Sequence, residues 1–471
     1  MTDRREVEAA IARLDRSALA GARWFAAKGH AIESVTPETA FVLDVAGPHV
    51  LAVASMALDD GSAQRYTVAL TGDPLREAAP GDGAWRALAV AMAEGRVVPA
   101  TTDEADPTAT PTAALVCRPA IAMGADDPGT ERALGADQSN TSVVLGERVL
   151  LKTFRRLQPG LNPDLEMTAF LTEQAGFPAV PPLAGFAELV DARHGTFTVA
   201  MAQAFVADAA DAYESIAEAL TAWLLVPGEV SVEYATEVAA DLGTLTAGLH
   251  AAVADGHGLP EMAPRPATRE ELREWAVAGH AELERALEIT PGPAGAALRE
   301  LAPAIAETLT VLDAIPTAPE VVRAHGDYHL GQVLIAPDGY RIIDFEGDPL
   351  RSIDDRRAHR SPLRDIASML RSLDHVGRSA GRRAQARAGG SLERPGLDLD
   401  GWLRRSRERF LEAYRTGLLE RHVVPDLDAD LLRAFEVESE CREFVYAATW
   451  LPSWLWAPTE GMRGLFEGTG A

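Results

Sequence analysis

The run from His325 to Gln332, with the sequence HGDYHLGQ, constrains this chain more than any other segment. It follows a short apolar segment, and two further apolar segments come after it, separated by the turn-forming sequence Pro337-Asp338-Gly339. We expect these two segments to pair as an antiparallel hairpin. Asp344 ends the second strand, so the hairpin should return it to the neighbourhood of Gln332, where the first strand begins.

The residue types at these three positions suit phosphoryl transfer. That reaction needs a carboxylate to orient the acceptor hydroxyl and oxygen ligands for the metal ion that bridges the phosphates. Asp327 fits the first role and is the expected catalytic residue. Gln332 and Asp344 are the expected ligands of Mg²⁺, which prefers hard oxygen donors, and Glu346 could assist through a water or a second metal. The alternative, an ordinary turn before a hairpin, does not explain the combined spacing.

A second hairpin precedes this region, formed by residues 142–145 and 148–154 around Gly146-Glu147. It carries Lys152, one of only two lysines in a chain with 44 basic residues; Lys28 is the other, and the sequence assigns it no role. We expect Lys152 to bind nucleotide phosphates and Glu166, in a helix opened by Pro163, to orient it, with the nearby Asp164 as the alternative. The polar turn before the hairpin lacks a glycine-rich pattern, so hydroxyl groups such as those of Ser139 and Ser142 should meet the phosphates.

Composition narrows the function classes. The net charge of −26 disfavours general binding to nucleic acid or to an anionic membrane, and no apolar run approaches the length of a spanning helix. The two cysteines, Cys117 and Cys441, provide neither a disulfide framework nor a metal site. The N-terminus is charged and unlike a signal peptide. We therefore expect a cytoplasmic protein without nucleic-acid or membrane partners.

A chain of 471 residues is too long for one ordinary core. We predict a cap subdomain over residues 1–98, an intermediate subdomain with the nucleotide-binding hairpin over 99–206, and a mainly helical lobe over 207–471. Residues 376–396, rich in Gly, Arg, Ser and Ala, are predicted to form a surface loop.

Two residues near the catalytic run are expected to give structural support. Asp365 should lie in the first turn of a helix that begins near Ser361-Pro362, where its charge complements the helix dipole. His325 is expected to be packed and hydrogen-bonded rather than to carry a proton.

The C-terminal region presents a candidate sugar-binding face. Arg442, Glu443 and Tyr446 recur at helical spacing on one face, and the aromatic segment containing Trp454 follows. Carboxylates bind hydroxyl or ammonium groups, and aromatic rings pack against sugar C–H surfaces. The alternative is a solvated helix face.

With these motifs in place, the chain resembles the maltokinase-like branch of the aminoglycoside-phosphotransferase, eukaryotic-kinase-like superfamily. The matching segments are residues 23–29, 149–154, 325–332, 344–349, 361–374 and 452–454. The resemblance implies an α+β, bilobal kinase-like fold with an N-terminal cap, a β-rich N-lobe and a mainly helical C-lobe. It also implies that adenine binds a hinge at Gln203, Phe205 and Val206, with Asp208 contacting the ribose.

The sugar-binding helix departs from the maltokinase pattern. Glu443 and Tyr446 are kept, while the lysine, the first tyrosine and the second glutamate of that pattern are absent. The helix is more similar to that of actinobacterial glucosamine kinases, and losing a lysine while keeping Glu443 would favour a cationic 2-amino group.

The resemblance thus implies an ATP- and Mg²⁺-dependent enzyme that makes glucosamine 6-phosphate, acting as a monomer or weak homo-oligomer. The alternatives are a maltokinase, an aminoglycoside phosphotransferase and a catalytically inactive binding module.

Overall fold

The computed structural model describes residues 4–22, 24–44, 47–101, 112–120, 128–135, 140–226, 231–348, 351–389 and 399–467. The chain divides into two compact units. Unit 1 comprises residues 1–208 and 345–357, and unit 2 comprises residues 209–344 and 358–471. The change of unit at Asp208 lies close to the expected border at 206/207, but the return of residues 345–357 to unit 1 was not anticipated. The finer borders stay predictions.

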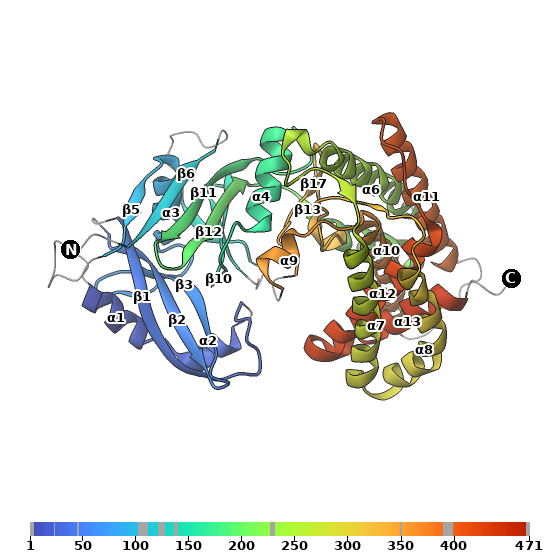
Figure 1. The fold of residues 1–471 in the computed structure, drawn as a ribbon, viewed down its shortest axis with the longest axis horizontal. Helices are drawn as coiled ribbons and strands as arrows, with labels where there is room; N and C mark the ends of the chain where they lie inside the picture. The colour runs from blue at the N-terminus through green and yellow to red at the C-terminus, as the bar shows by residue number, and fades with distance from the viewer. Residues whose placement is uncertain are drawn as a thin grey trace. The chain divides into compact units, whose positions relative to one another are not determined.

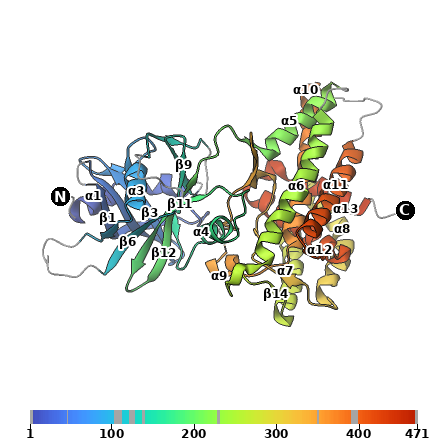
Figure 2. The same ribbon diagram turned by 90° about the horizontal axis from the view of Figure 1, so that it is seen from above.

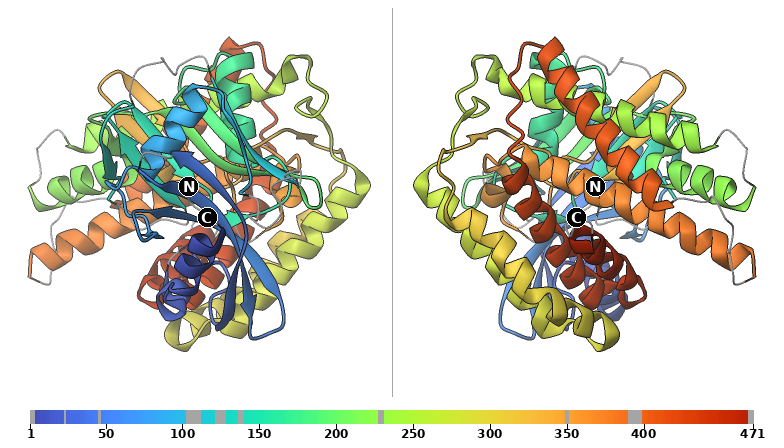
Figure 3. Two further views of the ribbon diagram at one scale, coloured as in Figure 1. Left: turned by 90° about the vertical axis from the view of Figure 1, so that its left-hand side faces the viewer. Right: turned by 90° about the vertical axis from the view of Figure 1, so that its right-hand side faces the viewer.

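Unit 1 contains two antiparallel sheets. The first has the order β1-β2-β3-β10, with β4 paired to β3, and its blue strands are seen in Figure 3, left. Its elements and the adjoining helices are α1 (Arg4–Ala12), α2 (Arg16–Gly21), β1 (Ile32–Asp44), β2 (His49–Leu58), β3 (Ala63–Thr71), β4 (Arg76–Glu77) and β10 (Arg156–Leu157). Strand β10 follows the predicted nucleotide-binding hairpin, so the first sheet is completed by a strand from beyond residue 98.

The second sheet of unit 1 has the order β5-β6-β11-β12-β9-β8-β7 (Figure 1). Its elements are β5 (Val97–Pro99), β6 (Ala113–Pro119), β7 (Glu131–Ala133), β8 (Thr141–Leu145), β9 (Val149–Thr153), β11 (Leu183–Asp191) and β12 (Gly195–Ala204). Helix α3 (Ala84–Ala93) packs between the two sheets, and its apolar side chains share one core with strands of both. Helix α4 (Pro163–Ala169) begins at Asn162, whose side chain accepts from the Asp164 N–H, and α9 (Ile353–Arg357) completes the unit.

Unit 2 is mainly helical (Figures 1 and 2). Its helices are α5 (Ala212–Leu225), α6 (Ser231–Ala254), α7 (Arg269–Ile289), α8 (Gly292–Asp313), α10 (Leu363–Arg387), α11 (Leu399–Glu420), α12 (Ala429–Trp450) and α13 (Trp456–Glu467). Its short strands are β13 (Ala210–Asp211), β14 (Arg265–Pro266), β15 (Glu320–Val321), β16 (Val333–Ala336) and β17 (Gly339–Ile342). Helix α6 packs on α5 and α11, while α10 packs on α5, α11, α12 and α13.

Both predicted hairpins are confirmed. Strands β8 and β9 pair with Ser142 opposite Lys152, and β16 pairs with β17 around the turn at residues 337–338. The predicted surface loop over 376–396 is wrong for residues 376–387, which continue α10, while residues 390–396 lie outside the described part of the chain. Gly377 was interpreted as a loop residue, yet it allows close packing: a Cβ there would lie 2.7 Å from Leu403 and 2.8 Å from Trp402.

Among the residues that the structure describes, no helix combines the length and apolar character needed to span a membrane.

Candidate active site

The catalytic loop, defined here as residues His325–Gln332, is held from behind by helix α10. The Asp365 carboxylate, at the start of that helix, accepts hydrogen bonds from the backbone N–H of His325 at 2.8 Å and of Gly326 at 3.1 Å. Two turns further along, Ser372 Oγ accepts from the Leu330 N–H at 3.1 Å. Both ends of the loop are thus fixed through backbone amides, and Asp365 has the supporting position expected of it.

His325 connects the loop to the end of strand β17. Its Nδ1 accepts from the Asp327 N–H at 3.4 Å, which places the ring proton on Nε2, and Nε2 donates to the Ile343 carbonyl at 3.1 Å. The ring is buried. Both ring nitrogens are thus engaged with backbone groups, those of Asp327 and of Ile343 beside Asp344, so His325 ties the catalytic loop to the end of β17.

The Asp327 carboxylate is the open group of the loop. Its side chain is 46% exposed, and His329 Nε2 lies 3.7 Å from Oδ2. His329 Nδ1 accepts from the Gly331 N–H at 3.1 Å, so its proton is on Nε2, facing Asp327. Burial acts to raise the pKa of Asp327, but His329, and more weakly His325 and Arg371, outweigh it and hold the pKa well below its usual range. Asp327 is therefore an ionised acceptor of a hydrogen bond.

Gln332 and Asp344 are brought together, as the hairpin predicted. Gln332 Nε2 lies 3.5 Å from Asp344 Oδ2, and the Gln332 carbonyl accepts from the Ile343 N–H at 3.0 Å. Asp344 adopts a left-handed backbone with φ of 65°, uncommon outside glycine. The two side chains lie side by side, and the amide oxygen of Gln332 and the carboxylate of Asp344 are hard donors of the kind that Mg²⁺ prefers.

Unit 1 holds a separate group of charged residues, the lysine cluster, formed by Lys152, Asp164, Glu346 and Asn140. Lys152 Nζ lies 2.7 Å from Asp164 Oδ2 and 3.3 Å from Glu346 Oε2. Asn140 Nδ2 donates to Glu346 Oε2 at 2.6 Å, and the Phe345 N–H donates to Asp164 Oδ1 at 3.0 Å. In this cluster two buried carboxylates, those of Asp164 and Glu346, hold the Lys152 ammonium in place.

Asp164 is in hydrogen-bond contact with Lys152 at 2.7 Å and so can orient the ammonium, while the expected role of Glu166 in orienting Lys152 stays a prediction. Glu166 accepts from Arg357 Nε at 2.9 Å and from Arg357 Nη2 at 2.6 Å, which joins α4 to α9. The sequence signal for Asp164 was present: it follows Asn162-Pro163, which cap and open the helix, so its side chain lies in the first turn.

The remaining residues expected to bind ATP are only partly placed. Ser142 lies in β8 opposite Lys152, and Gln203 lies in β12 opposite Leu150. The Phe205 N–H donates to the Arg148 carbonyl at 2.8 Å, and its ring lies 5.3 Å from the Arg132 guanidinium.

Val206 and Asp208 complete the expected hinge. Both follow β12, and Asp208 has φ of 53° at the end of unit 1. Ser139 lies outside the described residues, and nucleotide contacts of the hinge stay a prediction.

Glu443 and Trp454, two of the expected sugar-binding residues, contact each other in unit 2. Trp454 Nε1 donates to Glu443 Oε1 at 3.1 Å, and Arg371 Nη1 donates to Glu443 Oε2 at 2.7 Å. Arg371 also lowers the pKa of Asp327, so one guanidinium acts on both the expected sugar ligand and the expected catalytic residue. Arg371 was not found from the sequence, since only the fold brings α10 against α12.

Arg442 and Tyr446, the other two expected sugar-binding residues on α12, have other surroundings than Glu443 and Trp454. Arg442 Nη2 donates to Glu438 at 3.0 Å and its Nε lies 3.8 Å from Glu282, so it joins α12 to α7. Tyr446 is 46% exposed. Their contacts with a sugar stay predictions, and Arg442 already has a structural partner on a neighbouring helix.

Comparison with known proteins relates this architecture to one family. Residues 130–402 match the model of the phosphotransferase enzyme family, and residues 19–106 match the maltokinase N-terminal cap domain. The chain is 32% identical to a glucosamine kinase of Streptacidiphilus jiangxiensis over 90% of both chains. It is 30% identical to a glucosamine kinase of Mycolicibacterium smegmatis, over 84% of this chain and 91% of the relative.

Solved structures of glucosamine kinases also resemble this chain over nearly its whole length. A glucosamine kinase crystal form superimposes with a TM-score of 0.75 at 27% identity, covering 98% of this chain and 99% of the other. A glucosamine kinase in complex with glucosamine, ADP and inorganic phosphate gives a TM-score of 0.71 at 28% identity, with the same coverage. The expected kinase-like fold is confirmed, with a strand-rich N-terminal region and a helical C-terminal region. The chain belongs to the phosphotransferase enzyme family, in the group of its glucosamine kinases.

Proposed function

We propose that this chain is an ATP-dependent glucosamine kinase, which transfers the γ-phosphoryl group to the 6-hydroxyl of glucosamine. The observation that carries the proposal is the catalytic loop, in which Asp327 is open and ionised while Gln332 and Asp344 meet at 3.5 Å. The two relatives described above are glucosamine kinases and match this chain over most of their length, which supports the choice of acceptor.

Asp327 would orient the acceptor hydroxyl. In a loose phosphoryl-transfer transition state the attacking oxygen keeps its proton until late, so a carboxylate is needed more for alignment than for strong basicity. A low pKa suits this role, because the carboxylate is ionised at every pH near neutrality and always accepts the hydrogen bond. The late proton would pass to Asp327, whose half-exposed side chain can release it to water.

Gln332 and Asp344 would hold Mg²⁺, which would neutralise charge on the phosphate oxygens. Lys152 would contribute a fixed positive charge to the nucleotide phosphates. Its two carboxylate partners, Asp164 and Glu346, would hold the ammonium in place.

Glu443 would recognise the sugar. Its carboxylate is held by Arg371 and Trp454 and is therefore fixed in direction, as a group that must accept hydrogen bonds from a sugar should be. A carboxylate also pairs with the ammonium at position 2 of glucosamine, which glucose and maltose lack. The match of residues 19–106 to the maltokinase cap domain keeps maltose as the second candidate acceptor.

One assay tests the proposal. ADP release at fixed ATP and Mg²⁺ is measured with glucosamine, glucose, maltose and an aminoglycoside as acceptors. We expect kcat/KM to be highest for glucosamine. A Glu443→Gln variant should lose more of kcat/KM with glucosamine than with glucose. Turnover of maltose equal to that of glucosamine would reject the assignment, and so would an Asp327→Ala variant with full activity.

A further inference from the structure

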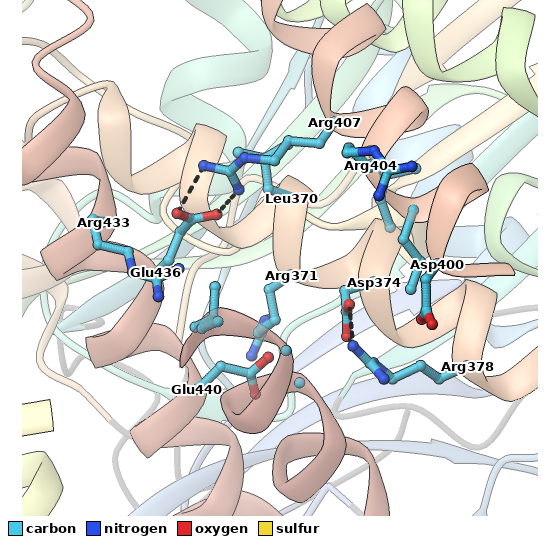
Figure 4. A pocket seen from close by; sticks show the side chains of 15 residues that line it. Leu370, Arg371, Asp374, Arg378, Asp400, Arg404, Arg407, Arg433, Glu436 and Glu440 are labelled. Carbon is cyan, nitrogen blue, oxygen red and sulfur yellow. Dashed lines mark hydrogen bonds and ion pairs between the residues drawn. The ribbon is translucent and has the colours of Figure 1, made fainter. Parts of the chain in front are cut away.

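A cavity of about 590 Å³ lies within unit 2, on the side of α10 that faces α11, α12 and α13 (Figure 4). Its volume falls in the range of small-molecule sites, about 300–1,000 Å³. Of the residues named above for catalysis and sugar recognition, only Arg371 belongs to its walls. The cavity is therefore a second candidate binding site.

The walls of the cavity are rich in arginine. Five guanidinium groups line it, those of Arg371, Arg378, Arg404, Arg407 and Arg433, against four carboxylates. In a chain with a net charge of −26, a cavity whose side chains carry more positive than negative formal charge is a local exception. Such an exception favours an anionic ligand.

The carboxylates of the walls are largely neutralised. Asp374 forms a bidentate pair with Arg378, and Glu436 pairs with Arg407 (Figure 4). Glu440 accepts from His375 Nε2 at 3.0 Å, and both groups are buried. These carboxylates have donors of their own, so they would not repel an anion as free carboxylates do.

Two guanidinium groups remain without an acceptor among the residues that the structure describes. Arg404, on α11, is exposed and has no hydrogen-bond or ion-pair partner there. Arg433, on α12, packs over the Phe466 ring at 5.1 Å, and its Nη2 is buried without a hydrogen-bond partner. Burial also lowers the pKa of Arg433, because the loss of water outweighs the attraction of Glu436, and Arg407 adds to the lowering. An anion would supply the missing partner of Nη2.

Two glycines of α13 keep the cavity open. A Cβ on Gly461 would lie 2.4 Å from Glu440 Oε1, and a Cβ on Gly464 would lie 2.4 Å from Arg378 Nη2. Side chains at these positions would displace the groups that form the walls.

We propose that this cavity binds a phosphate-bearing small molecule of monosaccharide size. The planar fork of a guanidinium matches phosphate oxygens two at a time, and Arg404 and Arg433 offer such forks from opposite sides of the cavity (Figure 4). The remaining carboxylate, Asp400, lies on the same wall as Arg404 and can accept from hydroxyl or ammonium groups of the same ligand. A phosphorylated amino sugar combines these features.

The cavity is connected to the proposed sugar ligand through Arg371, which lines the cavity and donates to Glu443. An anion that drew Arg371 toward the cavity would loosen Glu443 and weaken acceptor binding. This coupling rests on the proposed function, whereas binding in the cavity does not.

Calorimetric titration of glucosamine 6-phosphate and, separately, of inorganic phosphate tests the site. The full chain is saturated beforehand with glucosamine and a non-hydrolysable ATP analogue, so that the active site is filled. We expect saturable binding that Arg404→Gln/Arg433→Gln weakens about tenfold or more, because each guanidinium contributes a charge-assisted pair. Arg404→Gln alone, at an exposed position, should weaken it severalfold without affecting folding.

The matched control is Arg405→Gln, at the next position of α11 but outside the cavity walls. It should leave binding unchanged. Equal affinity for both probes would mean that the cavity recognises the phosphate group alone. Tighter binding of glucosamine 6-phosphate than of inorganic phosphate would add a role for Asp400. Absence of saturation, or equal loss in the control, overturns the site.

A kinetic measurement tests the coupling. The sugar phosphate should raise KM for glucosamine in the wild type and much less in Arg404→Gln/Arg433→Gln, with kcat in its absence unchanged in both. Binding without any variant-dependent change in KM would overturn the coupling alone. Loss of turnover with every acceptor would instead count against the proposed function.

Discussion

The lysine cluster of unit 1 and the catalytic loop of unit 2 hold their charged groups in opposite ways. Lys152 is 15% exposed and lies between two carboxylates, so its charge is balanced by side chains. Asp327 is 46% exposed, and the loop that carries it is held mainly through backbone amides. Removing the lysine should therefore damage both fold and function, while removing the loop carboxylate should damage function far more than fold.

The energetic reason lies in desolvation. A buried ion pair gains little over apolar packing, but loss of one partner leaves the other charge uncompensated. In the lysine cluster that penalty falls on Asp164 and Glu346, both largely buried. In the catalytic loop the open face of Asp327 is hydrated, so a neutral isostere costs little stability. This difference in burial suits the two roles. Lys152 is a fixed cation for the phosphates, whereas Asp327 is an acceptor that must contact substrate and water in turn.

The largest expected effect is that of Asp327→Asn. We expect kcat to fall about a thousandfold, because the amide cannot accept the proton of the acceptor hydroxyl. The midpoint of thermal unfolding should fall by less than in Lys152→Ala, because the carboxylate that His329 stabilises is 46% exposed and water screens its interactions. ADP release and calorimetry measure the two quantities. A large fall in the unfolding midpoint would remove the contrast between the loop and the cluster.

Lys152→Ala should affect both quantities. We expect a higher KM for ATP and a free energy of unfolding lower by about 3 kcal/mol, because the buried Asp164 loses its cation and Glu346 keeps only Arg356. Urea unfolding and steady-state kinetics provide the measurements. A kinetic defect without loss of stability would show that the cluster is hydrated as openly as the loop.

Lys28→Ala is the matched control, as the only other lysine. Its Nζ donates to the carbonyls of Gly21 and Ala22 at the end of α2, away from the cluster. We expect a change in stability within about 0.5 kcal/mol and unchanged kinetics.

Asp365→Asn should lower kcat less than Asp327→Asn does, and lower stability less than Lys152→Ala does. The carboxylate accepts from two loop amides, and such charge-assisted bonds contribute about 1.5–3 kcal/mol. We expect stability to fall by about 2 kcal/mol and kcat about tenfold, with KM for ATP unchanged, since Lys152 lies in the other unit. Asp430→Asn, an exposed first-turn acid of α12, should change neither. A shift in KM for ATP equal to that in kcat would reject a positioning role.

Local patterns in the sequence account for the parts of the fold that were predicted. The two hairpins, the start of α4 at Pro163 and the meeting of Gln332 with Asp344 follow from turn residues, alternation and spacing. Whether Asp164 or Glu166 faces Lys152 depends on how α4 is rotated against the sheet, which is a tertiary contact. Gly377 was misinterpreted for the same reason, because only the packing of α10 on α11 shows why that glycine lies inside a helix.

The smallest expected effect is the change with pH in the stability difference between wild type and Asp365→Asn. It tests whether Asp365, which holds the catalytic loop, is charged. Burial acts to raise the pKa of Asp365, but His250, His325 and the loop amide outweigh it, so its pKa is lowered in the folded state. A lowered pKa stabilises the fold above the unfolded value of about 3.9, and this contribution is lost as the pH falls through the folded pKa. The stability difference between wild type and Asp365→Asn should thus be constant from pH 7 to about pH 5 and shrink below that. Urea unfolding at several pH values measures it. A difference that grows on acidification would mean a raised pKa and a neutral Asp365, and the catalytic loop would then be held by ordinary hydrogen bonds rather than by a buried charge.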